Sequence, residues 1–436
     1  MYIATIGLEI HAELKTDSKM FCSCKNDPDE EKPNVNICPI CLGHPGTLPV
    51  LNKQAIKYVL KIGHAVQGKI ADFTEWDRKN YFYPDIPKGY QISQYKYPLV
   101  SGGELAGVKL TRIHLEEDTA QSTHDTHHKS LINFNRAGVP LMELVTEPVI
   151  HTAETAVAFA RELQLLLRYL GAGEANMEKG ELRVEANISV ASREDTNALK
   201  FGTKVEVKNL NSFRSVERAI SYEIKRHTSI LEKIDEGVKN DAKIIQETRG
   251  WDENKQETFS QRTKEDSHDY RYFPEPDIPK LRLSEVKEFD KENMTKEIRE
   301  LPWEKRNRLK KDFGLTDKEV EVFVESISVG EYFEEVIKDN PKIVKLSANY
   351  ILSDYLGLLK KENKSVDGGD DKKGNGVGTI YIKNFTKLML MIEDKKVSSR
   401  GAKDILAYLM KENIDPEEIA EKYGLIQKSD EGEIRK

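Results

Sequence analysis

The stretch Ile6-Gly7-Leu8-Glu9-Ile10-His11-Ala12-Glu13-Leu14 decides the fold of the first part of the chain. Its even positions are apolar, whereas Glu9, His11 and Glu13 occupy odd positions. Because successive side chains of a strand point to opposite faces, this alternation predicts a strand with one apolar face and one ionisable face. Such one-sided polarity favours an antiparallel sheet that packs a core on one side and leaves the other side available.

Further strand patterns follow in the first 290 residues, and two helices interrupt them. The strand segments are residues 108–115, 131–134, 182–190 and 203–208. Thr152 can cap a helix that ends near Gly171, and a second helix begins near Ser212 or Ser215. We therefore predict an α+β domain over residues 1–290, built on an antiparallel sheet.

From about Lys291 onward the sequence changes character. Strand patterns vanish, Lys and Glu dominate, and helical spacing takes over, as in the apolar stripe within residues 344–356. Residues 362–376 are rich in Gly and charged groups, which indicates a flexible loop or linker. A final helical segment begins near Ile380. We therefore predict an all-α domain over residues 291–375 and a tail domain over residues 376–436.

The whole chain has 436 residues, with 67 Lys and Arg against 74 Asp and Glu, and a formal net charge of −7. This length predicts about three domains. No stretch approaches the roughly 18–20 apolar residues of a membrane span, and the first residues carry Glu9, His11 and Glu13, unlike a signal peptide. We therefore expect a cytoplasmic protein without a membrane segment. Net charge is a sum over faces and domains, so its sign does not exclude a nucleic-acid partner.

All four cysteines lie in one short segment, as Cys22, Cys24, Cys38 and Cys41. They form a C-x-C pair and a C-x2-C pair. Cytosolic thiols stay reduced, and two pairs at this separation can close a tetrahedral Zn²⁺ site. Since four Cys ligands leave no open coordination position, we expect a structural zinc and not a catalytic one. The alternative is a set of reduced thiols without a metal.

Acidic side chains gather in three segments near predicted strands. The groups concerned are Glu9, His11, Glu116, Glu117 and Glu143. Carboxylates with an imidazole favour an oxygen-rich divalent site of the Mg²⁺ type. Each acid alone is also consistent with a solvated strand residue, and Glu143 can instead pair with Arg136 or Arg161.

Residues 77–97 combine basic and aromatic side chains. The run Asp77-Arg78-Lys79-Asn80-Tyr81-Phe82-Tyr83-Pro84-Asp85 is followed by Tyr90, Tyr95 and Tyr97. Tyrosines beside Arg and Lys can stack on bases while the cations contact phosphate; ordinary packing at strand ends is the other interpretation. The turns at residues 133–138 and 208–212 combine amides with cations, which suits polyphosphate or ribose contacts, although such turns are common without ligands.

Together these segments resemble the B subunits of the aspartyl/glutamyl-tRNA amidotransferases. The resemblance rests on residues 6–11, 77–85, 91–94, 114–118, 208–212, 246–249 and 269–277, whose motifs are long and keep their order. The helical remainder resembles the family too, down to residues 397–403. The resemblance implies that residues 1–290 form a cradle with the catalytic fold of glutamine synthetase and the guanidino kinases, and that the YqeY-like tail binds tRNA.

For the chemistry, the resemblance implies an ATP- and Mg²⁺-dependent ligase that acts on misacylated tRNA. Members of the family phosphorylate the side-chain carboxylate of Glu-tRNA(Gln) or Asp-tRNA(Asn), and ammonia then displaces the phosphate to form the amide. Carried over by position, the residues that would hold Mg²⁺ are Glu9, His11, Glu117 and Glu143, with Glu116 supporting them. The residues expected to contact the ATP phosphates or the tRNA 3′ end are Lys79, Arg136 and Lys208.

The resemblance also implies partner proteins. We find no glutaminase apparatus in the sequence, so ammonia is expected to come through a channel from the family's A subunit, an amidase (glutaminase). The small C subunit of the family would complete a heterotrimer. Family members usually continue with another helical segment, so the end at Lys436 is expected to be a short tail, natural or a boundary of a longer chain.

Two other functions are consistent with parts of the sequence. A zinc-containing tRNA-binding subunit without catalysis would keep the Cys segment and the second helix, whose basic side carries Arg214, Arg218, Lys225 and Arg226. It would not need the acids. A free-standing ligase of the glutamine synthetase type would act on free glutamate. The sequence does not distinguish Glu-tRNA(Gln) from Asp-tRNA(Asn) as the natural substrate.

Overall fold

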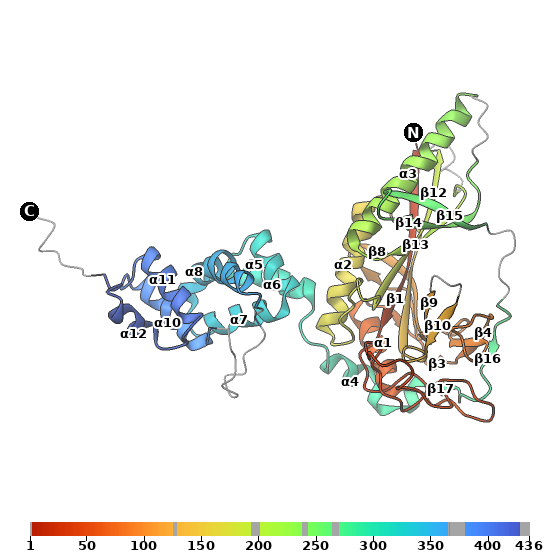
Figure 1. Cartoon of the computed structure of the whole chain (residues 1–436), viewed down its shortest axis with the longest axis horizontal. Coiled ribbons are helices and arrows are strands. Elements are labelled where there is room, and N and C mark those ends of the chain that lie inside the picture. The colour runs from red at the N-terminus through yellow and green to blue at the C-terminus, as the bar shows by residue number, and fades with distance from the viewer. Residues whose placement is uncertain are drawn as a thin grey trace, which may run out of the picture. The chain divides into compact units, whose positions relative to one another are not determined.

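The computed structural model describes residues 2–124, 129–192, 201–237, 243–263, 270–364, 366 and 380–427. The chain forms two compact units, Met1–Leu301 and Pro302–Lys436. The first unit combines strands with helices, and the described residues of the second unit are helical, apart from an isolated bridge (Figure 1). The α+β class is therefore confirmed. Asp269 and most of the predicted linker, residue 365 and residues 367–376, lie outside the described residues.

A ten-stranded sheet dominates the first unit. Its strands are β1 (Tyr2–Glu13), β2 (Lys69–Ile70), β6 (Val100–Ser101), β7 (Glu104–Leu105), β8 (Val108–Glu117), β11 (Pro140–Thr146), β12 (Leu182–Ser192), β13 (Val205–Leu210), β14 (Glu247–Asp252) and β15 (Glu257–Thr263). Their order is β15-β14-β13-β12-β1-β11-β8-β6-β2, with β7 on β8. The neighbouring strands run antiparallel except β13 and β14, which are parallel. The prediction of an antiparallel sheet is thus largely confirmed.

The central strand β1 has the two faces that its sequence predicts. Ile6, Leu8 and Ile10 are at most 1% exposed, whereas the odd positions are half-buried. The buried side chains face the helices of the unit, so the ionisable side chains of β1 lie on the other face of the sheet.

Three helices cover the apolar face of the sheet (Figure 1). They are α1 (Lys53–Ala65), α2 (Ala153–Tyr169) and α3 (Phe213–Asp235). Thr152 caps α2 by accepting a hydrogen bond of 3.2 Å from the backbone N–H of Thr155. Ser212 caps α3 in the same way, with 3.1 Å to the N–H of Ser215. Both predicted helices are confirmed, and of the two possible starts of α3 the structure selects Ser212.

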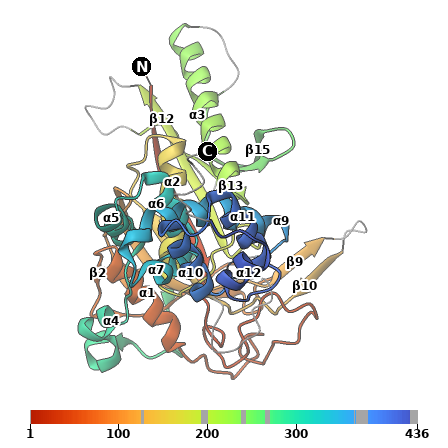
Figure 2. The same cartoon turned by 90° about the vertical axis from the view of Figure 1, so that its left-hand side faces the viewer.

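Smaller elements lie on the opposite side of the large sheet. A three-stranded sheet contains β4 (Asp77–Asn80), β5 (Tyr90–Ser93) and β16 (Phe273–Pro274). The hairpin of β9 (Gln121–His124) and β10 (Ser130–Asn133) extends outward from the unit (Figure 2). The remaining elements are β3 (Phe73–Thr74), β17 (Leu281–Arg282), η2 (Leu283–Glu285), η3 (Lys287–Phe289) and α4 (Lys291–Lys296).

The second unit is a helical bundle. Its elements are α5 (Pro302–Phe313), α6 (Asp317–Glu325), α7 (Ile327–Ile337), η4 (Pro341–Ile343), α8 (Val344–Asn349), η5 (Tyr350–Tyr355, π-helical), α9 (Leu356–Lys361), α10 (Ile382–Glu393), α11 (Ser399–Leu409) and α12 (Pro416–Lys422). Tyr332, Tyr355 and Phe385 pack together, with ring centroids 5.4–5.7 Å apart. Helices from both sides of residue 375 therefore share one core. No helix of the described chain has the length and apolarity to cross a membrane.

A buried ion cluster joins α3 to β14 and β15. The Glu223 carboxylate accepts hydrogen bonds from Arg226 at 2.8 Å and from Thr258, and it lies 3.2 Å from Arg249 Nε and from His227 Nε2. Burial alone would raise the pKa of Glu223, but these partners outweigh it and lower the pKa to about 2. The cluster therefore attaches the middle of α3 to the edge of the sheet.

Replacing Glu223 with glutamine is expected to lower the free energy of unfolding by about 3 kcal/mol, because two guanidinium groups lose their buried anion. The folded pKa of about 2 is below the unfolded value of about 4.3, so this stabilisation is present above pH 4.3 and is lost as the pH falls toward 2. Urea unfolding should therefore show a smaller difference between wild type and variant at pH 3 than at pH 7. Glu217→Gln, at an exposed acid of the same helix, is the matched control. Equal stability of Glu223→Gln and wild type at pH 7 would contradict this account.

Candidate functional site

The polar face of the large sheet brings ionisable side chains together from three neighbouring strands. His11 of β1 lies opposite Glu143 of β11, and Glu143 lies opposite His114 of β8. Because residues two apart in a strand share a face, Glu9 joins His11 and Glu116 joins His114. We call Glu9, His11, His114, Glu116 and Glu143 the carboxylate cluster.

His11 lies at the centre of the carboxylate cluster. Its Nε2 is 3.3 Å from Glu143 Oε2, 3.6 Å from Glu116 Oε1 and 4.0 Å from Glu9 Oε1. His114 Nε2 lies 3.6 Å from Glu143 and 3.8 Å from Glu116. The ligand atoms of Glu9, His11 and Glu143 lie within 4.8 Å of one another, and so do those of His114, Glu116 and Glu143. This donor set fits a divalent cation that prefers oxygen ligands.

The charges in the carboxylate cluster are strongly coupled. Burial opposes the charged form of His11, but its hydrogen bond to Glu143 and the charges of Glu116 and Glu9 outweigh burial and raise the pKa of His11 to about 9. Burial and the charge of Glu143 raise the pKa of Glu9. Burial also acts to raise the pKa of Glu143, but His114 and His11 outweigh it and lower that pKa. A cation at this point is therefore favoured, and a metal would replace the proton of His11.

Groups around the cluster hold its carboxylates in place. Ser93 Oγ of β5 donates to Glu116 at 2.9 Å, and Arg112 Nη2 of β8 donates to Glu143 at 3.1 Å. Hydrogen bonds of this kind orient the ligands of metal sites. The alternative pairing expected for Glu143 is wrong in both its forms. The Arg136 guanidinium donates instead to the carbonyls of Thr119 and Ala120, and that of Arg161 lies over the ring of Phe213.

Glu117 does not join the carboxylate cluster, although the family resemblance predicts it as a ligand together with Glu9, His11 and Glu143. It follows Glu116 directly and therefore points to the other side of β8. Its Oε1 accepts a hydrogen bond of 3.0 Å from the Ile92 N–H, and Lys88 Nζ lies 2.6 Å away. There it lines a cavity of about 220 Å³ beside the Cys segment. In the structure, Glu116 and His114 lie in the carboxylate cluster, where the resemblance leads us to expect Glu117.

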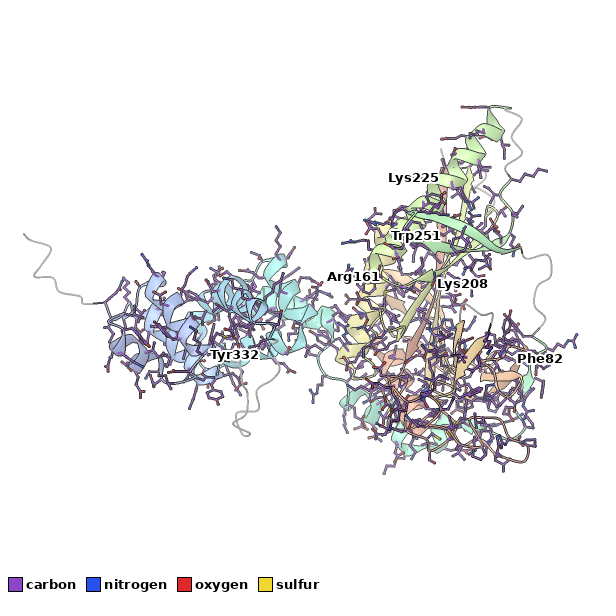
Figure 3. The ribbon with its side chains drawn as sticks, in the orientation of Figure 1. Phe82, Arg161, Lys208, Lys225, Trp251 and Tyr332 are labelled. Atoms are coloured by element: carbon purple, nitrogen blue, oxygen red, sulfur yellow. The ribbon has the colours of Figure 1, made fainter. Side chains whose placement is uncertain are left out.

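The three predicted phosphate-binding cations lie at different points around the polar face. Lys79 of β4 is surrounded by the charges of Glu116 and Glu143, which outweigh burial and raise its pKa. Lys208 lies on β13 (Figure 3). Its Nζ is 2.8 Å from Glu185, which is opposite Glu9 in the register. Arg136 lies 3.6 Å from Asp118. Lys79 therefore acts electrostatically with Glu116 and Glu143 of the carboxylate cluster, and Lys208 with Glu9.

A second charged group, which the sequence does not single out as a site, lies along the same face. Arg183 of β12 is opposite His11 and donates to Asp118 at 2.5 Å. Burial and the charge of Asp118 raise the pKa of Glu13 to about 8. The alternation of residues 182–190 places Arg183 on the polar face, but only the strand pairing brings it next to His11. Arg183, Asp118 and Glu13 therefore continue the set of charged side chains on the polar face beyond the carboxylate cluster.

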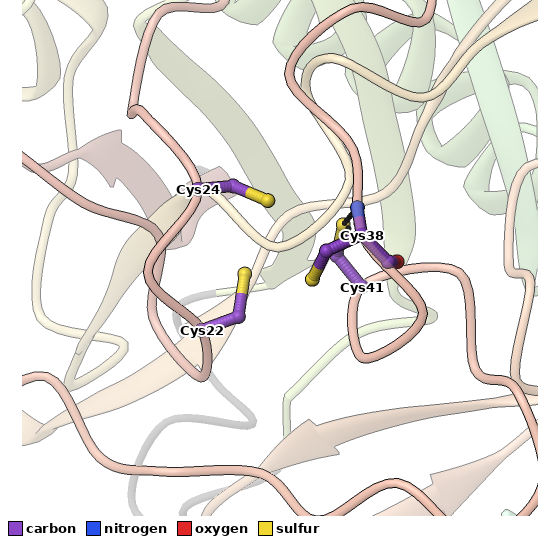
Figure 4. Close-up of side chains that lie close together, drawn as sticks. All are labelled: Cys22, Cys24, Cys38 and Cys41. Carbon is purple, nitrogen blue, oxygen red and sulfur yellow. Dashed lines mark hydrogen bonds between the residues drawn. The ribbon is translucent and has the colours of Figure 1, made fainter.

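The four cysteines form a second candidate metal centre. Their Sγ atoms lie within 4.8 Å of one another, and Figure 4 shows Cys22 and Cys24 on one strand of the loop facing Cys38 and Cys41 on another. A zinc bound by four thiolates at 2.3 Å separates neighbouring sulfurs by about 3.8 Å. The backbone N–H of Cys38 donates to Cys41 Sγ at 3.1 Å. The arrangement fits tetrahedral zinc.

Lys19 supports the negative charge of such a centre. Its side chain is 1% exposed, and its Nζ lies 3.9 Å from Cys41 Sγ and donates to the Phe134 carbonyl at 3.1 Å. Hydrogen bonding from Cys22, partly opposed by burial and helped by Lys19, lowers the pKa of Cys41 to about 5. Gly138, at φ +85°, passes close by, where a Cβ would lie 3.6 Å from that of Cys41. The Cys segment thus packs directly on the turn that leads into β11.

Two models of known protein families match separate parts of the chain. Residues 4–287 match the family model described as the GatB/GatE catalytic domain, and residues 331–436 match that described as the GatB domain. The chain is 42% identical to the B subunit of the aspartyl/glutamyl-tRNA(Asn/Gln) amidotransferase of Gloeothece citriformis, over all of this chain and 87% of that protein. It is 42% and 41% identical to the B subunits of Thermodesulfovibrio yellowstonii and Persephonella marina, each over 99% of this chain and 88% of the relative.

Proposed function

Because the chain belongs to the family of aspartyl/glutamyl-tRNA(Asn/Gln) amidotransferase B subunits, we propose that it amidates misacylated Glu-tRNA(Gln), Asp-tRNA(Asn) or both. It is a ligase that forms a carbon–nitrogen bond. One observation supports the site most directly. The side chains of the carboxylate cluster lie close together on the polar face of the large sheet.

The reaction needs activation of a carboxylate, which is a poor electrophile. The γ-phosphoryl group of ATP moves to a side-chain oxygen of the acylated Glu or Asp, giving an acyl phosphate and ADP. Ammonia then attacks the acyl carbon, phosphate leaves, and the nitrogen loses a proton to give the amide. Bound Mg²⁺ would supply charge neutralisation for the phosphates in this step.

The residues of the polar face have matching roles in this proposal. The carboxylate cluster would hold Mg²⁺, and Arg112 and Ser93 keep two of its carboxylates in position. Lys79, whose charged form Glu116 and Glu143 stabilise, is proposed to contact the transferred phosphoryl group. Arg136 and Lys208 are proposed to contact ATP phosphate or the tRNA 3′ end. Glu117, paired with Lys88, is proposed to act next to the cluster and not as a ligand.

The partners and the division of the chain follow from the same proposal. A zinc centre would use all four cysteines, and ammonia is proposed to come from the amidase partner, the A subunit of the complex. The small C subunit completes the heterotrimer in the cytoplasm. Residues 1–290 would form the catalytic cradle, of the glutamine synthetase and guanidino kinase type. Residues 291–375 would form the helical connection and residues 376–436 the tRNA-binding tail.

The function is tested with the complex reconstituted from this chain and its two partner proteins. We expect ATP-dependent formation of Gln-tRNA(Gln), Asn-tRNA(Asn) or both from the misacylated tRNAs, with glutamine as the nitrogen donor. The comparison of the two tRNAs identifies the natural substrate. Tight tRNA binding without amide formation would favour a non-catalytic role, and turnover of free glutamate without tRNA would favour a free-standing ligase.

A further inference from the structure

A continuous row of tyrosine rings lies beside the carboxylate cluster and has no part in the chemistry described above. In order along the row, its members are Tyr83, Tyr81, Tyr270, Tyr272 and Tyr95. Successive ring centroids are 6.1, 5.9, 5.9 and 4.4 Å apart. Tyr95 and Tyr272 are stacked face to face, with 7° between their planes. We call this set the tyrosine row.

Backbone contacts hold the tyrosine row in place although its members come from distant segments. β16 pairs with β4, so the segment that precedes β16 lies against the end of β4. Asn80 fixes that segment, since its N–H donates to the Tyr270 carbonyl at 3.0 Å and its side chain donates to the Arg271 carbonyl at 2.9 Å. The N–H of Tyr95 donates to Asp77 at 2.9 Å. The rings therefore sit on a prearranged support.

The ends of the row are open to solvent. Tyr95 is 62% exposed and Tyr83 is 56% exposed. Phe82, next to Tyr83 in the sequence, is 88% exposed at the outer margin of the small sheet (Figure 3). Exposed aromatic groups concentrated on one surface mark an interaction site more often than a packing accident. These exposed rings gain little burial from the fold, so packing alone does not explain them.

Lys79 links the row to the carboxylate cluster. Its Nζ lies 5.0 Å from the ring centroid of Tyr270 and 5.9 Å from that of Tyr81. Lys79 belongs to β4, which pairs with β5, and Ser93 of β5 donates a hydrogen bond of 2.9 Å to Glu116 of the cluster. Lys79 therefore lies beside the middle of the row, between its two open ends. A chain that stacks on the row from one open end would place its terminal group near the carboxylates when it reaches Tyr270.

We propose that the tyrosine row binds the unpaired 3′-terminal nucleotides of the substrate tRNA by stacking their bases. This inference rests on the proposed function, in which the acyl group at the tRNA end must reach the carboxylate cluster. Single-stranded RNA is bound by rows of aromatic rings with cations alongside, and Lys79 supplies a cation here. The adenine of ATP is a poorer fit, because a single base needs one enclosed slot and this row is extended and open at both ends.

The test uses the reconstituted complex with Tyr95→Ala. Stacking contributes about 1–3 kcal/mol per base, so KM for misacylated tRNA should rise about 5- to 150-fold, while kcat and KM for ATP stay within about twofold. Tyr95→Phe should restore the wild-type KM, because the ring and not the hydroxyl stacks. Phe259→Ala, at a 43% exposed ring of β15 outside the row, is the matched control and should change none of these values.

A binding measurement separates the tRNA end from the rest of the tRNA. Removal of the unpaired 3′ nucleotides should weaken binding to wild type but not to Tyr95→Ala. A raised KM for ATP with an unchanged KM for tRNA would assign the row to the adenine of ATP and overturn the proposal. Unchanged KM values, or an equal loss of affinity for intact and shortened tRNA, would also overturn it. A wild-type complex without amidation would instead refute the proposed function.

Discussion

Glu143→Gln is expected to lower kcat for amide formation by about 10²- to 10³-fold. The substitution keeps the shape of the side chain but removes the charge that His11, His114 and Arg112 share. Loss of one charged or hydrogen-bonding group from the transition state costs about 2.7–4 kcal/mol, which is this range in rate. The rate is measured as single-turnover amidation of misacylated tRNA under saturating ATP.

The dependence on Mg²⁺ distinguishes a ligand from a residue that only supports the fold. For Glu143→Gln we expect the Mg²⁺ concentration at half-maximal rate to rise by at least about tenfold. Glu104→Gln, at an exposed acid of the neighbouring strand β7, is the control and should behave as wild type. A slow variant with an unchanged Mg²⁺ requirement and a lowered melting temperature would show that Glu143 acts through stability alone.

Two adjacent acids on β8 decide which groups complete the cluster. Glu116 lies 3.6 Å from His11 Nε2, whereas Glu117 pairs with Lys88 on the other side of the strand. Glu116→Gln should therefore raise the Mg²⁺ requirement as Glu143→Gln does, and Glu117→Gln should leave it within about threefold. The opposite order would return Glu117 to the ligand set that the family resemblance implies.

The carboxylate cluster shows how much of a site can be predicted from the alternation of polar and apolar residues along a strand. Residues 6–14 predict that Glu9 and His11 share a face, and they do, because the apolar positions between them must face the helices. Alternation also groups His114 with Glu116. It does not tell which residues of β8 share the side of the sheet that carries Glu9 and His11, because that depends on pairing with β11, where Glu143 lies opposite His114. The choice between Glu116 and Glu117 is therefore a tertiary question.

Pairing between distant segments explains the other omissions. Tyr81 and Tyr95 stand out in the sequence as aromatic residues near cations, but Tyr272 lies far along the chain and joins them only because β16 pairs with β4. Arg183 likewise reaches His11 only through the pairing of β12 with β1. The Cys segment is easier to predict, since all four ligands come from one short stretch whose spacing already limits the geometry.

Removal of zinc is expected to unfold the Cys segment and to lower the melting temperature of the first unit by on the order of 10 °C. The segment from Lys15 to Asn52 has no described helix or strand, and long connections of this kind rarely hold a shape by themselves. Backbone bonds from Val50 to Phe21 and from Asn52 to Met20, each of 2.9 Å, join its two ends to each other, and the Met20 N–H attaches it to the Gly138 carbonyl at 2.7 Å. A zinc joining both Cys pairs would close the loop between these attachments.

The loss should also disturb the surroundings of Glu117, because Gly138 lies between Cys41 and Glu117. We expect wild-type protein to contain about one zinc per chain, and Cys38→Ser/Cys41→Ser to contain none and to be cut by protease within residues 22–41. Leu48→Ala, at a 61% exposed position near the same segment, is the control and should keep the metal. Wild type without zinc, and with an intact segment, would contradict the site. A closed four-thiolate site on a loop of this length should stabilise the segment. If zinc is present but its removal changes neither the melting temperature nor proteolysis, the metal does not hold the segment together and this prediction is wrong.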